Sequence, residues 1–373
     1  MRHALASGGP LLGLALLLAT AAPGLAAELS LTTLIAGDED LLQVVPRPDG
    51  GLGVLRQAGV GRLAPNGAWL AAETAEPGQT LHLGDDGDLV GVVTHRAGAA
   101  DFAPTARFEL RDARGRLLWS LGETEDVGYS ISVRGAVVGK SLNINAPERN
   151  ALHFYGRGGT LAAEAVVPHL LGGRFSADGG LYFAQSASTG LIAFDAGGAE
   201  LWRRDGVRLF DATPDGRLTV AVHGERLELL DSGRPVARAD LTGLLVRRVA
   251  IAPDGARIAV AGREELRVYD GNLRPLWRDS LRDQGLAFTS VDLAAGDGWL
   301  LAGLARDLGP RVAVEERHPD GVVRAYDARG ALRHEARLAF DAWNIFTPTA
   351  ILDDTGKTLT ITTRRAVYRT TLP

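Results

Sequence analysis

The sequence has no cysteine among its 373 residues. The chain therefore cannot form disulfides, ligate zinc or an iron–sulfur cluster through thiolates, use a cysteine nucleophile, or carry a lipid on cysteine. It also has no basic excess, since 45 acidic side chains face 40 Lys and Arg, which disfavours nucleic acid as a partner. Glycine, in contrast, is abundant: 47 of 373 residues is about 13%, against a usual ~7%. Without a Gly-X-Y period, this excess predicts many tight turns and short strands.

Long apolar runs are scarce, and the most prominent one is N-terminal. Arg2 precedes an apolar run at residues 11–22, and small residues follow at 23–27. This pattern is typical of a secretory signal peptide, and the run is shorter than the ~20 residues of a membrane-spanning helix. We expect residues 1–26 to be a cleaved signal peptide, with an uncleaved anchor as the alternative. We expect residues 27–373 to be one domain, periplasmic or secreted, with no transmembrane segment.

An internal repeat consists of an apolar stretch, a turn that ends in glycine, and a second apolar stretch. The turn glycines are Gly50, Gly87, Gly135, Gly179, Gly216, Gly255, Gly298 and Gly356. Their separations are 37, 48, 44, 37, 39, 43 and 58 residues. Such spacing is typical of the ~40-residue, four-stranded blade of a β-propeller.

A second element pairs an aspartate with a tryptophan seven positions later. Its three copies are Asp112 with Trp119, Asp195 with Trp202, and Asp270 with Trp277. An aspartate suits a turn because its carboxylate accepts hydrogen bonds from backbone N–H groups two residues on. We expect each indole to cover the outer part of its sheet and to pack against the next blade.

The two ends of the chain predict how the ring closes. The last repeat lacks a fourth strand, while residues 29–35 form an orphan strand before the first full blade. Pairing residues 29–35 with the C-terminal blade, residues 346–373, would remove two open sheet edges. The sequence therefore predicts an all-β, monomeric propeller of eight four-stranded blades, with seven as the alternative.

These repeats resemble two kinds of propeller. The Pro-Asp-Gly turns, as at Pro214 to Gly216, resemble WD-repeat-like propellers of bacterial periplasmic and outer-surface proteins. The Asp-to-Trp hairpins resemble the repeats of PQQ-type propellers, whose docking motif runs Ala-x-Asp-x-x-Thr-Gly-x-x-x-Trp. Here the Asp-to-Trp offset is one shorter and the Thr before the Gly is missing. The resemblance covers nearly all of residues 29–373 and implies a bacterial extracytoplasmic β-propeller, not an activity.

Propellers bind their ligands with the loops around the central channel. The loops between the second and third strands of a blade open on the same face as the connectors between blades. Three such loops are long, at residues 94–105, 141–150 and 306–321, and the last contains Pro319 to Gly321, which predicts an extra hairpin turn. In these loops and in the connector at 340–346 the candidate binding residues are His95, Arg96, Asp101, Asn143, Asn145, Glu148, Arg149, Arg311, Glu315, Glu316, His318 and Trp343. Ordinary solvated loops are the alternative.

Catalytic patterns are weak. No histidine pair has metal-ligand spacing, and the acidic stretches 38–40 and 85–88 lack the terminal Glu of a calcium loop, which favours solvated turns. Neither a nucleophile elbow nor a phosphate-binding loop occurs. We predict no catalytic residue, metal or cofactor, and a scaffold that binds a protein partner in the cell envelope. The alternative is a lactonase-like or quinoprotein-like propeller enzyme with a site at the channel mouth.

Overall fold

The computed structural model describes residues 26–36, 39–47, 49–95, 106–282, 284–296, 298–306, 318–342, 349–353, 356–363 and 365–372. Six candidate residues lie outside these ranges: Arg96, Asp101, Arg311, Glu315, Glu316 and Trp343. For His318 the structure describes the strand but not the side chain. Nothing helical in the described ranges has the length and hydropathy needed to cross a bilayer.

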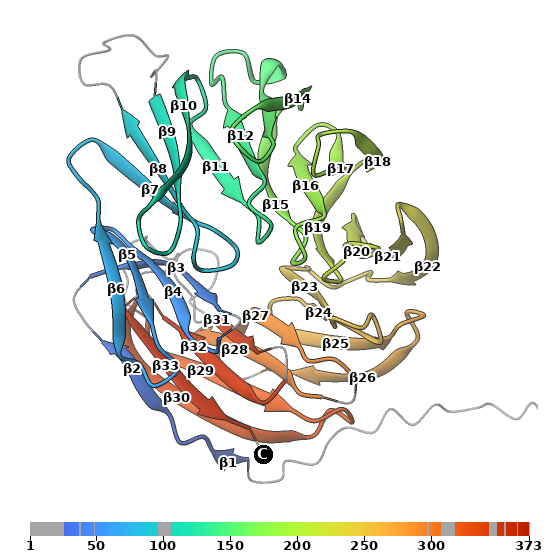
Figure 1. Cartoon of the computed structure of the whole chain (residues 1–373). Helices are drawn as coiled ribbons and strands as arrows, with labels where there is room; N and C mark the ends of the chain where they lie inside the picture. Colours follow the sequence, from blue (N-terminus) through green and yellow to red (C-terminus); the bar gives the residue numbers. More distant parts are fainter. Residues whose placement is uncertain are drawn as a thin grey trace, which may run out of the picture.

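Within these ranges the chain forms eight sheets around a central axis (Figure 1), which we number as blades 1 to 8. Blades 1 to 4 comprise β3–β6 (Leu41–Pro46, Leu52–Arg56, Gly59–Leu63, Trp69–Thr74), β7–β10 (Gln79–Leu83, Val90–His95, Ala106–Arg111, Leu117–Thr124), β11–β14 (Gly128–Ile131, Val137–Ser141, Ala151–Tyr155, Leu161–Val166) and β15–β18 (Leu170–Phe175, Leu181–Ser186, Gly190–Asp195, Glu200–Arg204). Blades 5 to 7 comprise β19–β22 (Val207–Ala212, Leu218–His223, Arg226–Asp231, Arg234–Asp240), β23–β26 (Arg248–Ile251, Arg257–Ala261, Glu265–Asp270, Pro275–Ser280) and β27–β30 (Leu286–Leu293, Leu300–Arg306, His318–Tyr326, Leu332–Ala342). Blade 8 contains β31–β33 (Thr349–Leu352, Thr358–Thr362, Ala366–Thr371). The predicted eight-bladed, all-β propeller is thereby confirmed.

The two ends of the chain meet in blade 8. The N-terminal strand β2 (Thr32–Ala36) pairs antiparallel with β33, with Thr32 opposite Arg369 and Ala36 opposite Ala366. In Figure 1 this blue strand lies beside the red C-terminal strands, as the outermost member of the sheet. Closure of the ring by its terminal strands, as the sequence predicted, is confirmed.

A further pairing at the N-terminus was not predicted. Strand β1 (Ala27–Glu28) runs parallel to β30, the outer strand of blade 7. The backbone N–H of Leu29 continues this pairing by donating to the carbonyl of Glu335 at 3.2 Å. The Leu29 side chain is buried in an apolar cluster that joins blades 7 and 8. An extended segment with one apolar side chain therefore occupies the outer edge of this blade.

The core lies between the blades, because the middle strands are covered on both faces. Every residue of β24 is buried, whereas the outer strand β22 of the preceding blade is mostly exposed. One cluster between blades 6 and 7 packs Trp277 and Phe288 together with aliphatic side chains. Continuous apolar burial on both faces explains why these strands do not alternate strictly between polar and apolar residues.

Two predicted turns differ from the structure. In blade 7 the N–H of Gly298 closes the predicted turn by donating to the carbonyl of Ala295 at 3.2 Å, but the positive φ of this turn falls on Gly296 (φ 58°). Pro319, Asp320 and Gly321 form no turn; they belong to β29, where Asp320 lies opposite Ala339. The prediction of an extra hairpin turn there was wrong, because the long pairing of β29 with β30 takes these residues into the sheet.

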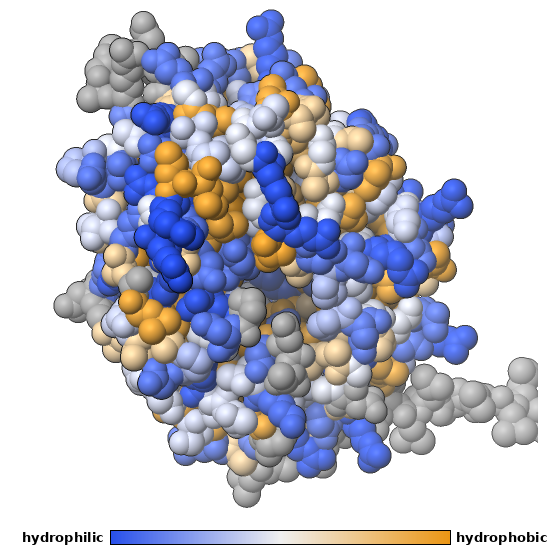
Figure 2. All heavy atoms as spheres, viewed as in Figure 1, coloured by the Kyte–Doolittle hydropathy of each residue, from blue (hydrophilic) through white to orange (hydrophobic). Residues whose placement is uncertain are grey.

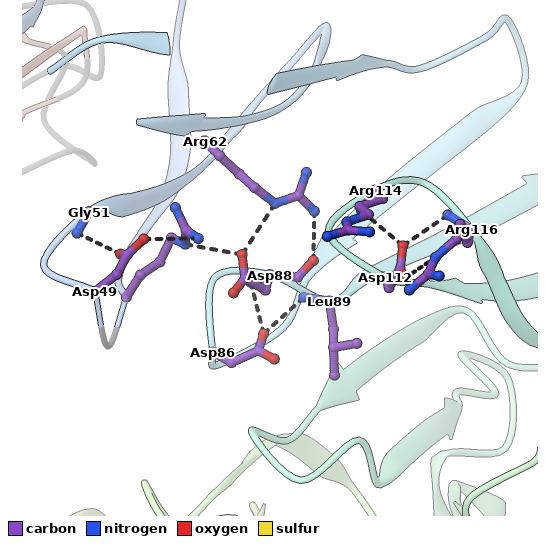
Figure 3. Close-up of polar contacts among 10 residues, drawn as sticks. Asp49, Gly51, Arg62, Asp86, Asp88, Leu89, Asp112, Arg114 and Arg116 are labelled. Atoms are coloured by element: carbon purple, nitrogen blue, oxygen red, sulfur yellow. Dashed lines mark hydrogen bonds and ion pairs between the residues drawn. The ribbon is translucent and has the colours of Figure 1, made fainter. Parts of the chain in front are cut away.

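Aspartates begin the turns between the third and fourth strands. In the close-up of Figure 3, Asp112 accepts hydrogen bonds from the backbone N–H groups of Arg114 (2.8 Å) and Arg116 (3.0 Å). Asp195 accepts in the same way from Gly197 and Ala199, and Asp270 from Asn272 and Arg274. Each carboxylate thus replaces backbone acceptors that a tight turn cannot supply.

The tryptophans connect successive blades. Trp119 lies against Gly159 in the corresponding turn of blade 3, and a Cβ atom at Gly159 would come within 2.7 Å of the indole. Trp202 lies in the same way against Gly233 of blade 5, and Trp277 against Gly330 of blade 7. Every one of these glycines has positive φ, so both the turn and the indole require glycine there.

Candidate functional site

We define the connector face as the side of the ring that carries the connectors between blades and the loops between second and third strands. Fifteen large hydrophobic side chains are exposed in the described part of the chain, and they fall into two groups. Eight lie at the beginning of outer strands. The other seven lie on the connector face: Leu42, Val127, Leu142, Ile144, Val166, Leu171 and Leu245. In the view of Figure 2, apolar surface forms separate patches among hydrophilic side chains, a distribution that favours binding through individual anchors.

Hydrogen bonds to asparagine side chains fix the conformation of the loop between β12 and β13. Asn143 Oδ1 accepts from the backbone N–H groups of Asn145 (3.0 Å) and Ala146 (2.9 Å). The buried Asn150 accepts from the backbone N–H of Asn143 at 2.7 Å. A 3-10 helix, Pro147–Arg149, follows. The Asn143 side chain therefore shapes the loop, and Glu148 and Arg149 project from one short helical turn.

Backbone bonds fasten this loop to the connector between blades 3 and 4. The N–H of His169 donates to the carbonyl of Pro147, and the N–H of Val167 donates to that of Asn150, both at 2.8 Å. The most exposed large side chain of the loop is Ile144, with 90% of its surface accessible. Sequence reasoning missed Ile144, since an isoleucine between two asparagines gives no chemical signal.

We define the Ile144 patch as Leu142, Ile144, Val166 and Leu171. Two of these residues belong to the loop, and the other two lie at the strand ends on either side of the connector that holds it. Exposed leucine and isoleucine on a fixed loop lose little conformational entropy on binding. The patch can therefore bury apolar side chains of a partner at low entropic cost.

His95 lies on the same face, at the end of β8. Its Nε2 atom is 3.1 Å from Oγ1 of Thr80 on the neighbouring strand. His95 also lines an open hollow of about 390 Å³ together with Arg107 and Glu123. Of the candidates the structure describes, His95 belongs to blade 2, while Asn143, Asn145, Glu148 and Arg149 share one loop of blade 3.

A buried polar cluster joins blades 2 and 3 beneath this face. Asp126, in the connector after β10, has a fully buried carboxylate. Its Oδ1 atom lies 2.7 Å from Nδ1 of His153, and its Oδ2 atom accepts from the Tyr155 hydroxyl at 2.9 Å. The hydrogen bond to Asp126 raises the pKa of His153. Sequence reasoning missed this cluster because its members are separated by 27 and 29 residues.

Charged groups on the innermost strands hold neighbouring blades together. Arg174 of β15 donates to Asp211 Oδ1 of β19 at 2.6 Å, and Asp211 Oδ2 accepts from the backbone N–H of Ile251 of β23 at 3.0 Å. Asp292 of β27 accepts from the backbone N–H of Leu352 of β31 at 3.0 Å, and burial raises its pKa to about 6. The carboxylates of Asp211 and Asp292 therefore accept structural hydrogen bonds from neighbouring blades.

The acidic stretch at 85–88 is also used structurally. Figure 3 shows Asp86 accepting from the backbone N–H groups of Asp88 and Leu89, both at 2.9 Å. The buried Arg62 of blade 1 donates to the backbone carbonyl of Asp88 at 2.6 Å, so this turn joins two blades. In the described part of the chain no three His, Asp or Glu side chains are arranged to hold a metal ion.

Fold and surface together define an eight-bladed propeller that exposes apolar side chains on its connector face. Neither a protein-family model nor a curated protein matches the chain. Solved propellers do: the C-terminal WD40 domain of Sif2 has a TM-score of 0.61 at 10% identity, covering 93% of this chain and 99% of that one. BamB from Moraxella catarrhalis has a TM-score of 0.56 at 16% identity, and the match covers 91% of this chain and 97% of that one. Sqt1 from Saccharomyces cerevisiae has a TM-score of 0.59 at 11% identity, and the match covers 93% of this chain and 99% of that one. At such identities the likeness shows the fold alone.

Proposed function

We propose that the protein is a non-catalytic scaffold that binds a protein partner through its connector face. The Ile144 patch carries this proposal, because an ordered loop exposes apolar side chains that the fold does not need for its core. Apolar anchors surrounded by polar groups are typical of protein-binding surfaces. Glu148 and Arg149, on the helical turn of the same loop, supply charge next to these anchors.

We further propose that the partner belongs to the cell envelope. The signal-peptide pattern at residues 1–26 supports export, and the lack of cysteine is compatible with an oxidising compartment. N-terminal sequencing of the protein recovered from its native cells tests export. A mature chain that starts near residue 27 is expected, whereas an intact Met1 on protein from the cytoplasmic fraction would contradict export.

Affinity capture from cell-envelope extract tests the binding proposal. Ile144→Asp places a charge on the patch, and the matched control Leu201→Asp places one on an outer strand at a leucine of 51% exposure. Burying one such anchor contributes about 1.5–3 kcal/mol, so Ile144→Asp should lower the recovery of the partner at least about tenfold. Leu201→Asp should retain it. If the parent and both variants recover the same set of partners equally, the connector face is not the binding surface.

A further inference from the structure

A groove lies on the outer wall of the ring, between blades 5 and 6. It encloses about 420 Å³ between the outer strand β22 and the hairpin β25–β26. Both β22 and β26 end their sheets, so each pairs on one side only. Both strands lie at the rim of the ring in Figure 1. The floor of the groove contains Tyr269, Leu273 and Pro275, of which the first two are buried.

Three guanidinium groups and one carboxylate, Asp240, line this groove, although the chain as a whole carries a net charge of −5. Arg238 lies 3.0 Å from the buried Glu228, which already accepts two hydrogen bonds from Arg204, so one carboxylate serves two arginines. Arg267 pairs with Glu265. Arg278 is exposed and has no ion pair or side-chain hydrogen bond within the described residues. The groove therefore combines an apolar floor with one unpaired guanidinium, that of Arg278.

Blade 7 shows what an outer edge of this ring accepts. There β1 adds in parallel to the outer strand β30, and Leu29 is buried beside it. Main-chain hydrogen bonds and one apolar anchor are the two interactions by which extended peptides bind sheet edges. The groove between blades 5 and 6 offers the same two features, and its arginines add a preference for negative charge.

We propose that this groove binds an extended peptide segment in which acidic residues flank one apolar side chain. The apolar side chain lies on Tyr269, Leu273 and Pro275, and the acidic residues face Arg278 and Arg238. This site shares no residue with the Ile144 patch and goes beyond the function proposed above. Its occupant is an acidic, unstructured segment of another protein.

Fluorescence anisotropy with defined peptides tests the proposal. The probe is fluorescein-labelled, amidated Ser-Asp-Glu-Leu-Asp-Glu-Ser; one comparison peptide replaces every acid with Lys, and another replaces Leu with Ser. We expect saturable binding of the acidic probe, weaker binding in 300 mM than in 50 mM NaCl, and at least about tenfold weaker binding of both comparison peptides. No saturable binding of the acidic probe, or equal binding of the Lys peptide, would overturn the proposal.

Variants locate the binding. Arg278→Glu should weaken binding of the acidic probe at least about tenfold, because it reverses an unpaired charge at the groove. Arg329→Glu, on an exposed turn of blade 7, is the matched control and should bind like the parent. Hydrogen exchange should slow at 234–240 and 275–280 when the probe is bound. Unchanged affinity in Arg278→Glu, or protection elsewhere, would overturn the assignment. Ile144→Asp should still bind the probe, so this proposal and the proposed function can fail separately.

Discussion

At the scale of single residues, the fit of an indole against a glycine joins one blade to the next. Trp119, Trp202 and Trp277 each lie against a glycine with positive φ in the following blade. Any side chain there would both strain the backbone and displace the ring. The partner glycine is thus as necessary to the contact as the tryptophan itself.

Two adjacent glycines in blade 3 separate these two effects. Gly158 (φ 93°) has open space where a Cβ would lie, whereas at Gly159 (φ 79°) the Cβ would lie 2.7 Å from Trp119. We expect Gly158→Ala to cost about 1 kcal/mol of unfolding free energy through the backbone alone. Gly159→Ala should cost about 2–4 kcal/mol, since displacement of Trp119 adds to the strain. Urea unfolding measures both. Equal losses would mean that the indole contact contributes nothing.

At the scale of elements, the connector between β10 and β11 is tied to strand β13 by the pair of Asp126 and His153. A histidine whose folded pKa is raised stabilises the fold fully below its unfolded pKa of about 6.5. This contribution is lost as pH rises through the folded pKa. Glu164 and Glu125 act in the same direction as Asp126.

The prediction is that His153→Gln removes a pH-dependent part of the stability. The parent should exceed His153→Gln in unfolding free energy most near pH 6, and the difference should shrink toward pH 8.5. His82→Gln is a control of opposite sign, because burial, Lys140 and His95 lower the pKa of His82 to about 4. There the parent should lose stability relative to the variant as pH falls below about 6.5. Urea unfolding between pH 5.5 and 8.5 measures both; parallel profiles would contradict the assignment.

Local signals explain which elements the sequence could predict. The blades follow from turn glycines, and the role of Asp112 follows from the turn that it begins, because each depends on a few neighbouring residues. The Asp126 cluster and the groove between blades 5 and 6 need residues from two blades, and their apposition leaves no trace in a linear pattern. The turn predicted at Pro319 to Gly321 was wrong for the reverse reason, because the long β29–β30 pairing overrides a local turn sequence.

At the scale of the whole molecule, the N-terminal segment makes two contacts on the outer side of the ring. Strand β2 completes blade 8, and β1 with Leu29 adds to blade 7. The first contact supplies the fourth strand of a blade, while the second covers an edge of a blade that already has four. These contacts should therefore contribute unequally to the stability of the ring.

Two truncations, both made in a chain of residues 27–373, separate the contacts. Removing residues 27–36 deletes β2 and exposes the edge of β33, so the melting temperature should fall by about 10 °C or more and the protein should self-associate. Removing only residues 27–30 keeps β2 but loses the buried Leu29, which should lower the melting temperature by a few degrees and leave a monomer. Calorimetry and size-exclusion chromatography with light scattering measure the two effects. If the longer truncation is as stable and monomeric as the shorter one, the terminal strand does not close the ring, and stability must come from the contacts between blades alone.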